Sequence, residues 1–265
     1  MFDVSIILVN YNTKEITKKC IESIYEKTQD VSFDVWVVDN ASQDGSCEMI
    51  EECFPCINLI KNDRNLGFGV ANNIAIEKSN SKYVFLLNTD TVLINNAIKI
   101  MLDFMNSNED AAACGGSLFN LEGDFVYSFG MLPRLKSYTF NRLGLSFLNK
   151  PEKKDRKKSQ QTEHIIGADL MLRRSVLNSV GLFDPRFFLY NEELELQFRI
   201  NQAGFKIYFL PEAKIIHLVG QSSKDKTLRL QYMRKGEYLY FELTQKNLPK
   251  FLLKILFKFL DLFGL

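Results

Sequence analysis

The stretch LLNTDT, residues 86–91, closes an apolar run that begins at Tyr83 and ends abruptly in Asn88, Thr89 and Asp90. An uninterrupted apolar run bounded by polar residues is typical of a parallel strand that is buried on both faces. A plain turn after such a strand would use Gly or Pro. A carboxylate at this place therefore needs a separate reason, because an unpaired charge is costly to bury.

Three further apolar runs precede this strand and alternate with helical patterns. Helical stretches open at Thr13 and Ser42, which are residue types expected of N-caps, and a third covers residues 69–78. The expected strands are residues 4–9, 34–38, 57–60 and 83–87. This order predicts a doubly wound α/β sheet, whose ligands bind beyond the carboxyl ends of the strands. Candidate site residues should therefore directly follow the strands.

Polar residues do follow all four strands, in the stretches VNYN, VVDNAS, KNDRNLGFGVANN and LLNTD. Any one of these stretches is explained by a turn or a helix cap, but four together favour a site. Asp39 ends an apolar strand and needs a hydrogen-bond donor, which a base or a ribose hydroxyl would supply. Gly67 and Gly69 permit close approach of a ligand, and Asn72 and Asn73 offer amide donors. The stretch lacks the GxGxxG pattern, which disfavours a classical NAD site.

Composition limits the class of protein. A formal net charge of +1 over 265 residues argues against a surface built for nucleic acid. The 5 cysteines fit a reduced protein, and the lone CxxC at Cys53 and Cys56 lacks the second pair that a zinc site requires. The N-terminus has no basic region before its apolar stretch, so we expect a first strand and a cytoplasmic chain.

The second half is less regular. Residues 101–105 favour a helix, and residues 111–128 favour two strands joined by a glycine-containing turn. Residues 133–163 lose apolar periodicity and are dense in Lys and Arg, which predicts a mobile surface loop. This loop is either a solvated linker or a flap near an acceptor or an anionic membrane.

A helix is expected in YNEELELQFRINQAG, residues 190–204, with Asn191 as N-cap and Gly204 as its end. Glu192, Glu193 and Glu195 fall in the first turn, where the helix dipole favours negative charge. Glu195 can also pair with an arginine four residues later. These structural roles account for one or two of the three acids, which leaves a catalytic role open.

Six motifs in order resemble the family-2 glycosyltransferases, and most closely the rhamnosyltransferase-like branch. They are SIILVNYN, VVDNAS, NLGFGVANN, LLNTDT, IIGADLMLRRSV and the long stretch from FDPRFF to LVGQS. The resemblance implies the GT-A (Rossmann-like) fold, a mixed, mainly parallel sheet flanked by helices. It implies a glycosyltransferase domain over residues 1–222, with a nucleotide-sugar half at 1–110 and an acceptor and catalytic half at 111–222. Residues 223–265 would form a separate helical tail.

The resemblance also assigns roles within the site. Residues 88–90 occupy the place of the DxD motif, so Asp90 would bind Mg²⁺ or Mn²⁺ that bridges a diphosphate. Asn88 stands at the first position of this motif, where the name DxD specifies an acid. His217 would bind the metal or the diphosphate. Glu193 matches the general base, with Glu192 as the alternative, and the helix N-terminus should keep that base ionised. The residues expected at the nucleotide sugar are Asn10, Tyr11, Asn12, Asp39, Asn65, Gly67, Asn72, Asn88, Gly167 and Ala168.

The implied activity is inverting transfer of a sugar, with rhamnose as one candidate, in cell-surface polysaccharide synthesis. The donor would be a UDP- or dTDP-linked sugar, and the acceptor a glycan or a polyprenyl-linked sugar. A non-catalytic nucleotide-sugar-binding or scaffold protein is the alternative, because Asn88 and Glu193 depart from the commonest motif forms. A nucleotidyltransferase is a third possibility, but the N-terminal region lacks a glycine-rich activating loop with its lysine.

The tail QKNLPKFLLKILFKFLDLFGL places a lysine at every fourth position, from Lys246 to Lys258, among Phe, Leu and Ile. It is too charged and too short to span a bilayer but matches an amphipathic helix lying on an anionic one. We therefore expect a peripheral protein at the inner face of the cell membrane. The alternative is a helix that packs on the domain or on a second subunit.

Overall fold

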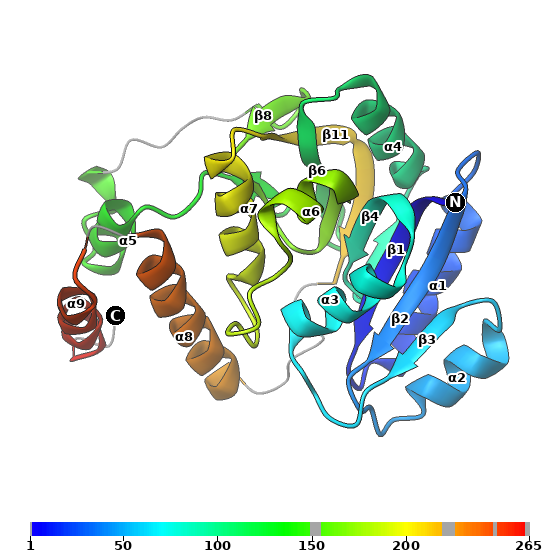
Figure 1. Ribbon diagram of the computed structural model, residues 1–265, viewed down its shortest axis with the longest axis horizontal. Helices are drawn as coiled ribbons and strands as arrows, with labels where there is room; N and C mark the ends of the chain where they lie inside the picture. The colour runs from blue at the N-terminus through cyan, green and yellow to red at the C-terminus, as the bar shows by residue number, and fades with distance from the viewer. Residues whose placement is uncertain (1, 149–154, 219–225, 246–247, 263–265) are drawn as a thin grey trace.

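A computed structural model describes residues 2–148, 155–218, 226–245 and 248–262. A mixed sheet lies at the centre with helices on both faces, and helices α5, α8 and α9 form a group to one side of it (Figure 1). The predicted α/β class with a C-terminal helix is therefore confirmed. Residues 150–154 of the basic stretch, residues 219–222 of the last motif and Lys246 lie outside the described residues.

The described residues contain a nine-stranded sheet with the strand order β3-β2-β1-β4-β10-β6-β11-β5, and β8 pairs with β11. Strands β1 to β4 pair in parallel, whereas β10 runs antiparallel to both β4 and β6. The register sets Asn10 beside Asp39, so the carboxyl ends of β1 and β2 share one edge. The strands are β1 (Phe2–Asn10), β2 (Phe33–Asp39), β3 (Asn58–Lys61), β4 (Ser81–Leu87), β5 (Thr91–Leu93), β6 (Ala111–Phe119), β7 (Phe129–Gly130), β8 (Gln160–Thr162), β9 (His164–Ile165), β10 (Asp169–Arg173) and β11 (Lys206–His217).

Two apolar layers cover the sheet. On one face, α1, α2 and α4 bury side chains such as Cys20, Ile21 and Met101. On the other face, α3, α6 and α7 contribute Ala71, Leu177 and others. Apolar residues at helical spacing form a stripe along each of these helices, and each stripe packs against the sheet. The helices are α1 (Lys14–Lys27), α2 (Ser46–Cys53), α3 (Phe68–Lys78), α4 (Ala97–Ser107), α5 (Leu135–Arg142), η1 (Ser146–Leu148), α6 (Arg174–Val180), α7 (Glu192–Gln202), α8 (Lys226–Thr244) and α9 (Lys250–Leu262).

The structure corrects one predicted helix start and confirms another. Helix α2 begins at Ser46 after a left-handed Gly45, so the prediction that Ser42 is its N-cap is wrong. Thr13 does precede α1, but its side chain makes no capping hydrogen bond, and the Asp44 carboxylate instead accepts from the Lys14 N–H at 2.8 Å. The hydroxyls of Thr13 and Ser42 instead form hydrogen bonds with neighbouring polar side chains. The sequence pattern does not reveal these partners.

The second half is more ordered than its sequence predicts. Strand β6 confirms the first strand of residues 111–128, but the second expected strand is reduced to a bridge between Phe119 and Phe125. The expected surface loop, residues 133–163, includes α5 and β8. Helix α5 has no fully buried residue, but Tyr138 stacks on Phe257 of α9 with ring centroids 5.7 Å apart. Tertiary packing therefore supports a helix that local periodicity does not predict.

The C-terminal helices form a third apolar cluster. Leu253 and Phe257 of α9 are buried against Tyr240 and Phe241 of α8 and against Phe187. The alternative prediction, in which the tail packs on the domain, therefore describes the inner face of α9. No helix in the described ranges is long and apolar enough to cross a membrane.

Candidate active site

A cavity of about 310 Å³ opens beyond the carboxyl ends of β1 and β4, where the fold is expected to bind ligands. Its walls come from both halves of the chain. The predicted residues that line it are Tyr11, Asn65, Gly67, Asn88, Asp90, Gly167, Ala168, Glu192, Glu193 and His217.

Asp90 and His217 meet at one wall of this cavity. The His217 Nε2 lies 3.3 Å from the Asp90 Oδ1, and both side chains are almost fully buried. Backbone pairing holds them, because the Leu218 N–H donates to the Asp90 carbonyl at 2.8 Å and His217 pairs with Thr91 across β11 and β5. Within the described residues no group of three or more His, Cys, Asp or Glu forms a complete metal cluster.

One carboxylate and one imidazole are donors that suit Mn²⁺, and the carboxylate suits Mg²⁺. Mg²⁺ in particular is commonly held by one or two carboxylates together with substrate phosphates. Asp90 and His217 therefore fit the protein side of a cation site whose remaining ligands come from a diphosphate and water. Asn88 lines the same cavity, and its backbone N–H donates to the Ala168 carbonyl at 3.0 Å.

Asp39 is buried but already has donors within the protein. Its Oδ1 accepts from the Asn10 Nδ2 at 2.6 Å, and its Oδ2 accepts from the Ser42 N–H at 2.8 Å. The argument that Asp39 requires a ligand is therefore wrong. The Ser42 hydroxyl also accepts from the Asn12 N–H at 2.8 Å, so Asp39 ties together the two loops that follow β1 and β2. Asp39, Asn10 and Asn12 do not line the cavity, whereas Tyr11 does.

The loop before α3 supplies another wall. Gly67 has φ +83°, and a β-carbon there would overlap the Phe188 carbonyl, so both the backbone and the packing require glycine. The Asn65 side chain accepts from the Gly67 N–H at 2.9 Å and shapes this turn. Asn72, which is predicted to contact the nucleotide sugar, does not line the cavity. Its amide instead donates to the Phe68 carbonyl at 3.0 Å.

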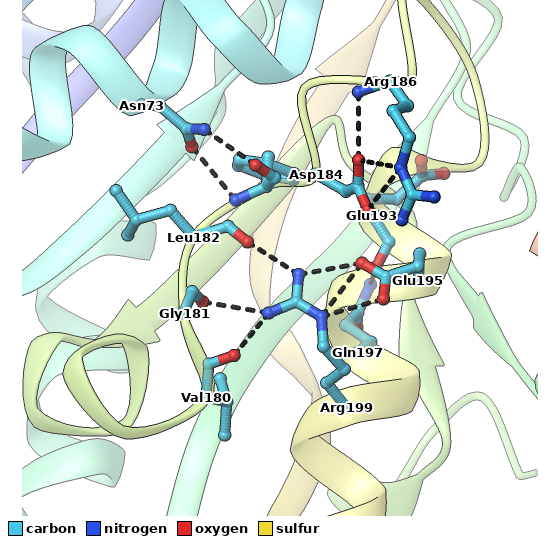
Figure 2. A network of polar contacts seen from close by, with 11 residues as sticks. Asn73, Val180, Gly181, Leu182, Asp184, Arg186, Glu193, Glu195, Gln197 and Arg199 are labelled. Atoms are coloured by element: carbon cyan, nitrogen blue, oxygen red, sulfur yellow. Dashed lines mark hydrogen bonds and ion pairs between the residues drawn. The ribbon is translucent and has the colours of Figure 1, made fainter. Parts of the chain in front are cut away.

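Helix α7 carries the two candidate bases at its first positions. Arg199 holds the helix in place, because its guanidinium binds Glu195 and donates to the carbonyls of Val180 and Leu182 at 2.6 Å each (Figure 2). The predicted pair of Glu195 and Arg199 is thus confirmed, at 2.8 Å. Gln197 adds a second anchor by donating to the Ile165 carbonyl at 2.8 Å. These contacts position the start of α7 over the cavity.

Glu192 and Glu193 both lie at the cavity, with Glu192 the more buried. Burial raises the pKa of Glu192 well above its ordinary value, and the Glu193 charge raises this pKa further. The Glu192 Oε2 is buried and has no hydrogen-bond partner among the residues that the structure describes. Burial also raises the pKa of Glu193, although backbone N–H groups at the helix start partly oppose this rise. Desolvation is thus the larger influence on the pKa of Glu193, and the helix N-terminus opposes it only in part.

One charged residue of the site lies outside every sequence motif. Arg229 of α8 is the only Arg or Lys that lines this cavity in the described part of the chain. Its guanidinium carbon lies 5.9 Å from the ring centroid of Tyr190, which also lines the cavity. Tyr190 and Asn191 both adopt left-handed backbone angles, with φ 71° and 68°, and they turn the chain into α7. Arg229 lies beyond the six motifs, so tertiary packing alone brings it to the site.

A larger hollow of about 1140 Å³ lies on another side of α7. It is lined by Asp184, Arg186, Glu195 and Arg199, whose charges already pair with one another at 2.5 and 2.8 Å. It contains none of the residues that follow strands β1 to β4. The smaller cavity is therefore the candidate active site.

Comparisons with known proteins agree with this geometry. The family model "Glycosyl transferase family 2" matches residues 5–181. An N-acetylglucosaminyl-diphospho-decaprenol L-rhamnosyltransferase of Mycobacterium tuberculosis is 25% identical over 225 residues, covering 78% of this chain and 73% of the relative. Rhamnosyltransferase WbbL of Escherichia coli is 24% identical over 230 residues, covering 81% and 83%. The chain is thus similar to the rhamnosyltransferase-like branch of the family.

A solved structure gives the same fold. The mannosyltransferase PcManGT from Pyrobaculum calidifontis, in complex with GDP-Man and Mn²⁺, superimposes with a TM-score of 0.65 at 16% identity. The match covers 93% of this chain and 66% of that one. The GT-A fold expected from the motifs is therefore confirmed.

Proposed function

Because this chain belongs to glycosyl transferase family 2, we propose that it transfers a sugar, with inversion, from a nucleoside-diphosphate sugar to a glycan or lipid-linked acceptor. One observation carries this proposal: Asp90, His217 and Glu193 come from distant parts of the sequence and line a single cavity at the strand ends. A carboxylate and an imidazole for a cation that holds the diphosphate, next to a partly buried acid, suit glycosyl transfer.

The first half of the chain holds the nucleotide. Tyr11, Asn65 and Gly67 line the cavity on the side of β1 and α3, where the nucleoside binds. Asp39 acts indirectly, because it fixes the loops after β1 and β2 through Asn10 and Ser42. Gly167 and Ala168 leave room for the sugar beside Glu193, since the Glu193 side chain already lies 3.4 Å from where a β-carbon of Gly167 would be.

Asp90 and His217 would hold Mg²⁺ or Mn²⁺ together with the diphosphate. When bound, such a cation neutralises the negative charge that develops on the departing diphosphate. Arg229 faces the same space and stabilises that charge through its guanidinium. Arg229 and a bound cation would thus be two sources of positive charge at the leaving group.

Glu193 acts as the general base. It takes the proton of an acceptor hydroxyl, whose oxygen forms a bond to the anomeric carbon while the bond from that carbon to the diphosphate breaks. Burial suits this role because a base is most effective when its pKa is raised toward the working pH. Burial raises the pKa of Glu192 well above its ordinary value, which favours the neutral form of this acid beside Glu193 and would spare the site a second buried charge.

The relatives favour a particular pair of substrates. Two of them are named rhamnosyltransferases, and one name specifies an acceptor in which N-acetylglucosamine is carried on decaprenyl diphosphate. We therefore propose a UDP- or dTDP-linked donor, with dTDP-rhamnose the first to test. A polyprenyl-diphosphate-linked sugar is the corresponding acceptor.

A lipid-linked acceptor requires access to a membrane, and α9 supplies a suitable face. Phe251, Leu252 and Ile255 are exposed while Leu253 and Phe257 are buried, so the helix has a second apolar face directed away from the domain. Exposed lysines accompany this face at positions 254 and 258. An exposed apolar and basic helix face is typical of peripheral attachment to anionic lipid. We propose that the protein is peripheral at the inner face of the cell membrane.

The test is turnover across a panel of donors. Release of nucleoside diphosphate is measured with UDP- and dTDP-sugars, with and without Mn²⁺ or Mg²⁺ and with and without a polyprenyl-diphosphate-linked N-acetylglucosamine. We expect one donor to be consumed in a metal-dependent and acceptor-stimulated reaction. Binding of a donor without turnover under every condition would instead identify a nucleotide-sugar-binding protein.

A further inference from the structure

A second hollow adjoins the active site. It has a volume of about 540 Å³ and is formed mainly by the segment between β6 and β7. Ile166 and His217 line both this hollow and the active-site cavity, so they form a shared wall. The side chains of Leu121, Glu122 and Tyr127 lie at the second hollow, beyond that wall from the candidate cation site.

Tyr127 is exposed and yet firmly held. Its side chain is 59% exposed, but its hydroxyl lies 3.0 Å from the Nε2 of the buried His164. Gly130 makes room for this contact, because a β-carbon there would overlap the Tyr127 hydroxyl. His164 and Gly130 are paired directly across strands β9 and β7. A buried histidine and a glycine thus fix the direction of an aromatic ring that contributes little to the core.

Ile166 links this hollow to the candidate base. The next residue in the chain, Gly167, lies beside Glu193, whose side chain is 3.4 Å from where a β-carbon of Gly167 would be. Burial raises the pKa of Tyr127, and the negative charge of Glu193 raises this pKa further. Leu121, which is 70% exposed, extends the apolar surface of the hollow. Fixed aromatic and apolar surface with a few polar groups at its rim is the usual composition of a site for a sugar-sized ligand.

We infer that this hollow is the acceptor site, in which the terminal pyranose ring of the acceptor stacks on Tyr127 and presents a hydroxyl to Glu193 past the boundary at Ile166 and His217, where the hollow adjoins the active-site cavity. The inference rests on the proposed function, which does not say where the acceptor binds. Tyr127 is a positioning residue, since it orients the ring without exchanging a proton. Glu122 at the rim supplies an acceptor for a second hydroxyl of the same sugar.

The test separates acceptor binding from donor binding. Kinetics are measured for the full chain with the donor selected by the panel and with N-acetylglucosamine diphosphate on a short polyprenyl chain as the acceptor. Tyr127→Ala should raise the KM for the acceptor about tenfold, because stacking and its apolar contact are lost. The KM for the donor and the slow hydrolysis of the donor without acceptor should not change. Tyr127→Phe keeps the ring and should recover most of the acceptor affinity.

Two further variants show whether a change in the acceptor KM could come from loss of folding instead of loss of acceptor contacts. Leu121→Ala changes a highly exposed side chain, leaves folding intact and should also raise the KM for the acceptor. Tyr25→Ala removes an exposed tyrosine from α1, away from both hollows, and serves as the matched control. An unchanged acceptor KM in both Tyr127→Ala and Leu121→Ala, with an active wild type, would overturn the acceptor site alone. Absence of transfer by the wild type with every donor and acceptor would overturn the proposed function as well.

Discussion

His217 lies with its Nε2 3.3 Å from the Oδ1 of Asp90, although the two residues belong to different halves of the chain. Substituting Asp90 by Ala removes the one carboxylate of this pair, and we expect it to abolish the metal-dependent part of donor binding. The fold should persist, because the backbone bond from Leu218 to the Asp90 carbonyl does not involve the side chain. Calorimetry with the donor, with and without Mn²⁺, measures the effect. Metal-dependent binding and turnover at wild-type levels would rule out Asp90 as a ligand.

Arg229 provides a second test of the diphosphate site. Arg229→Ala should weaken binding of UDP or dTDP about tenfold or more, because a charged hydrogen-bond donor contributes roughly 1.5–3 kcal/mol. Arg229→Lys keeps the charge and should lose less affinity. Arg186→Ala is the matched control, since Arg186 pairs with Asp184 at the surface and does not line this cavity. Equal nucleotide affinity in the Arg229→Ala variant and the wild type would remove Arg229 from the site.

The raised pKa of Glu192 predicts an unusual dependence of stability on pH. Its folded-state pKa is raised, so the folded protein binds more protons than the unfolded chain between the two pKa values, and stability falls as pH rises through this window. Glu192→Gln removes the buried carboxylate and should increase the free energy of unfolding at pH 8 by about 1 kcal/mol or more. Below the ordinary pKa of 4.5 the two proteins should be alike. Urea unfolding at pH 8 and pH 4 measures this; a variant less stable than the wild type at pH 8 would contradict it.

The outer face of α9 can be changed without disturbing its inner face. Deletion of the tail would uncover Phe241 and Tyr240, so the double substitution of Phe251 and Ile255 by Ser is the sharper test. This variant should lose flotation with anionic liposomes while keeping donor binding and thermal stability. Binding by the wild type should weaken with salt, because Lys254 and Lys258 each contribute about 1 kcal/mol near an anionic surface. Lys250 contributes less, since it pairs with Glu242 at 2.6 Å.

A matched control and a competing outcome complete this experiment. Ile94→Ser changes an exposed apolar residue between β5 and α4 and should leave flotation unchanged. If the outer face of α9 instead joins two copies of the chain, the wild type will not float with liposomes. Light scattering would then show the mass falling by half in the double variant.

The strand-end residues are predictable from sequence because each motif is local. An apolar run that ends in Asp39, or that leads through Asn88 and Thr89 to Asp90, is visible without any knowledge of the fold. What the polar groups bind is less predictable, since the partners of Asp39 are Asn10 and Ser42 from two different loops. Ser42 fails as a predicted N-cap for the same reason, because its hydroxyl accepts from the Asn12 N–H instead.

Features that depend on tertiary packing escape the sequence entirely. Arg229 reaches the site because α8 packs on α7, where the Phe198 and Tyr240 rings lie 6.5 Å apart. Burial raises the pKa of Glu193 and outweighs the opposing effect of the helix N-terminus, which is the only effect that sequence alone suggests. Tyr127 lies outside every sequence motif, and its position depends on the pairing of β7 with β9.

Glu193 is the residue on which the account depends most, and Glu193→Gln tests it most directly. Turnover and donor affinity are measured for Glu193→Gln and for Glu192→Gln at several pH values. We expect Glu193→Gln to bind the donor normally and to lose roughly 10²-fold or more in kcat. Because the pKa of Glu193 is raised, wild-type kcat/KM should fall as pH drops through a value above 4.5, and the variant should lose this limb. Glu192→Gln should retain far more activity. Wild-type kcat in Glu193→Gln, with the loss falling instead on Glu192→Gln, would contradict the assignment.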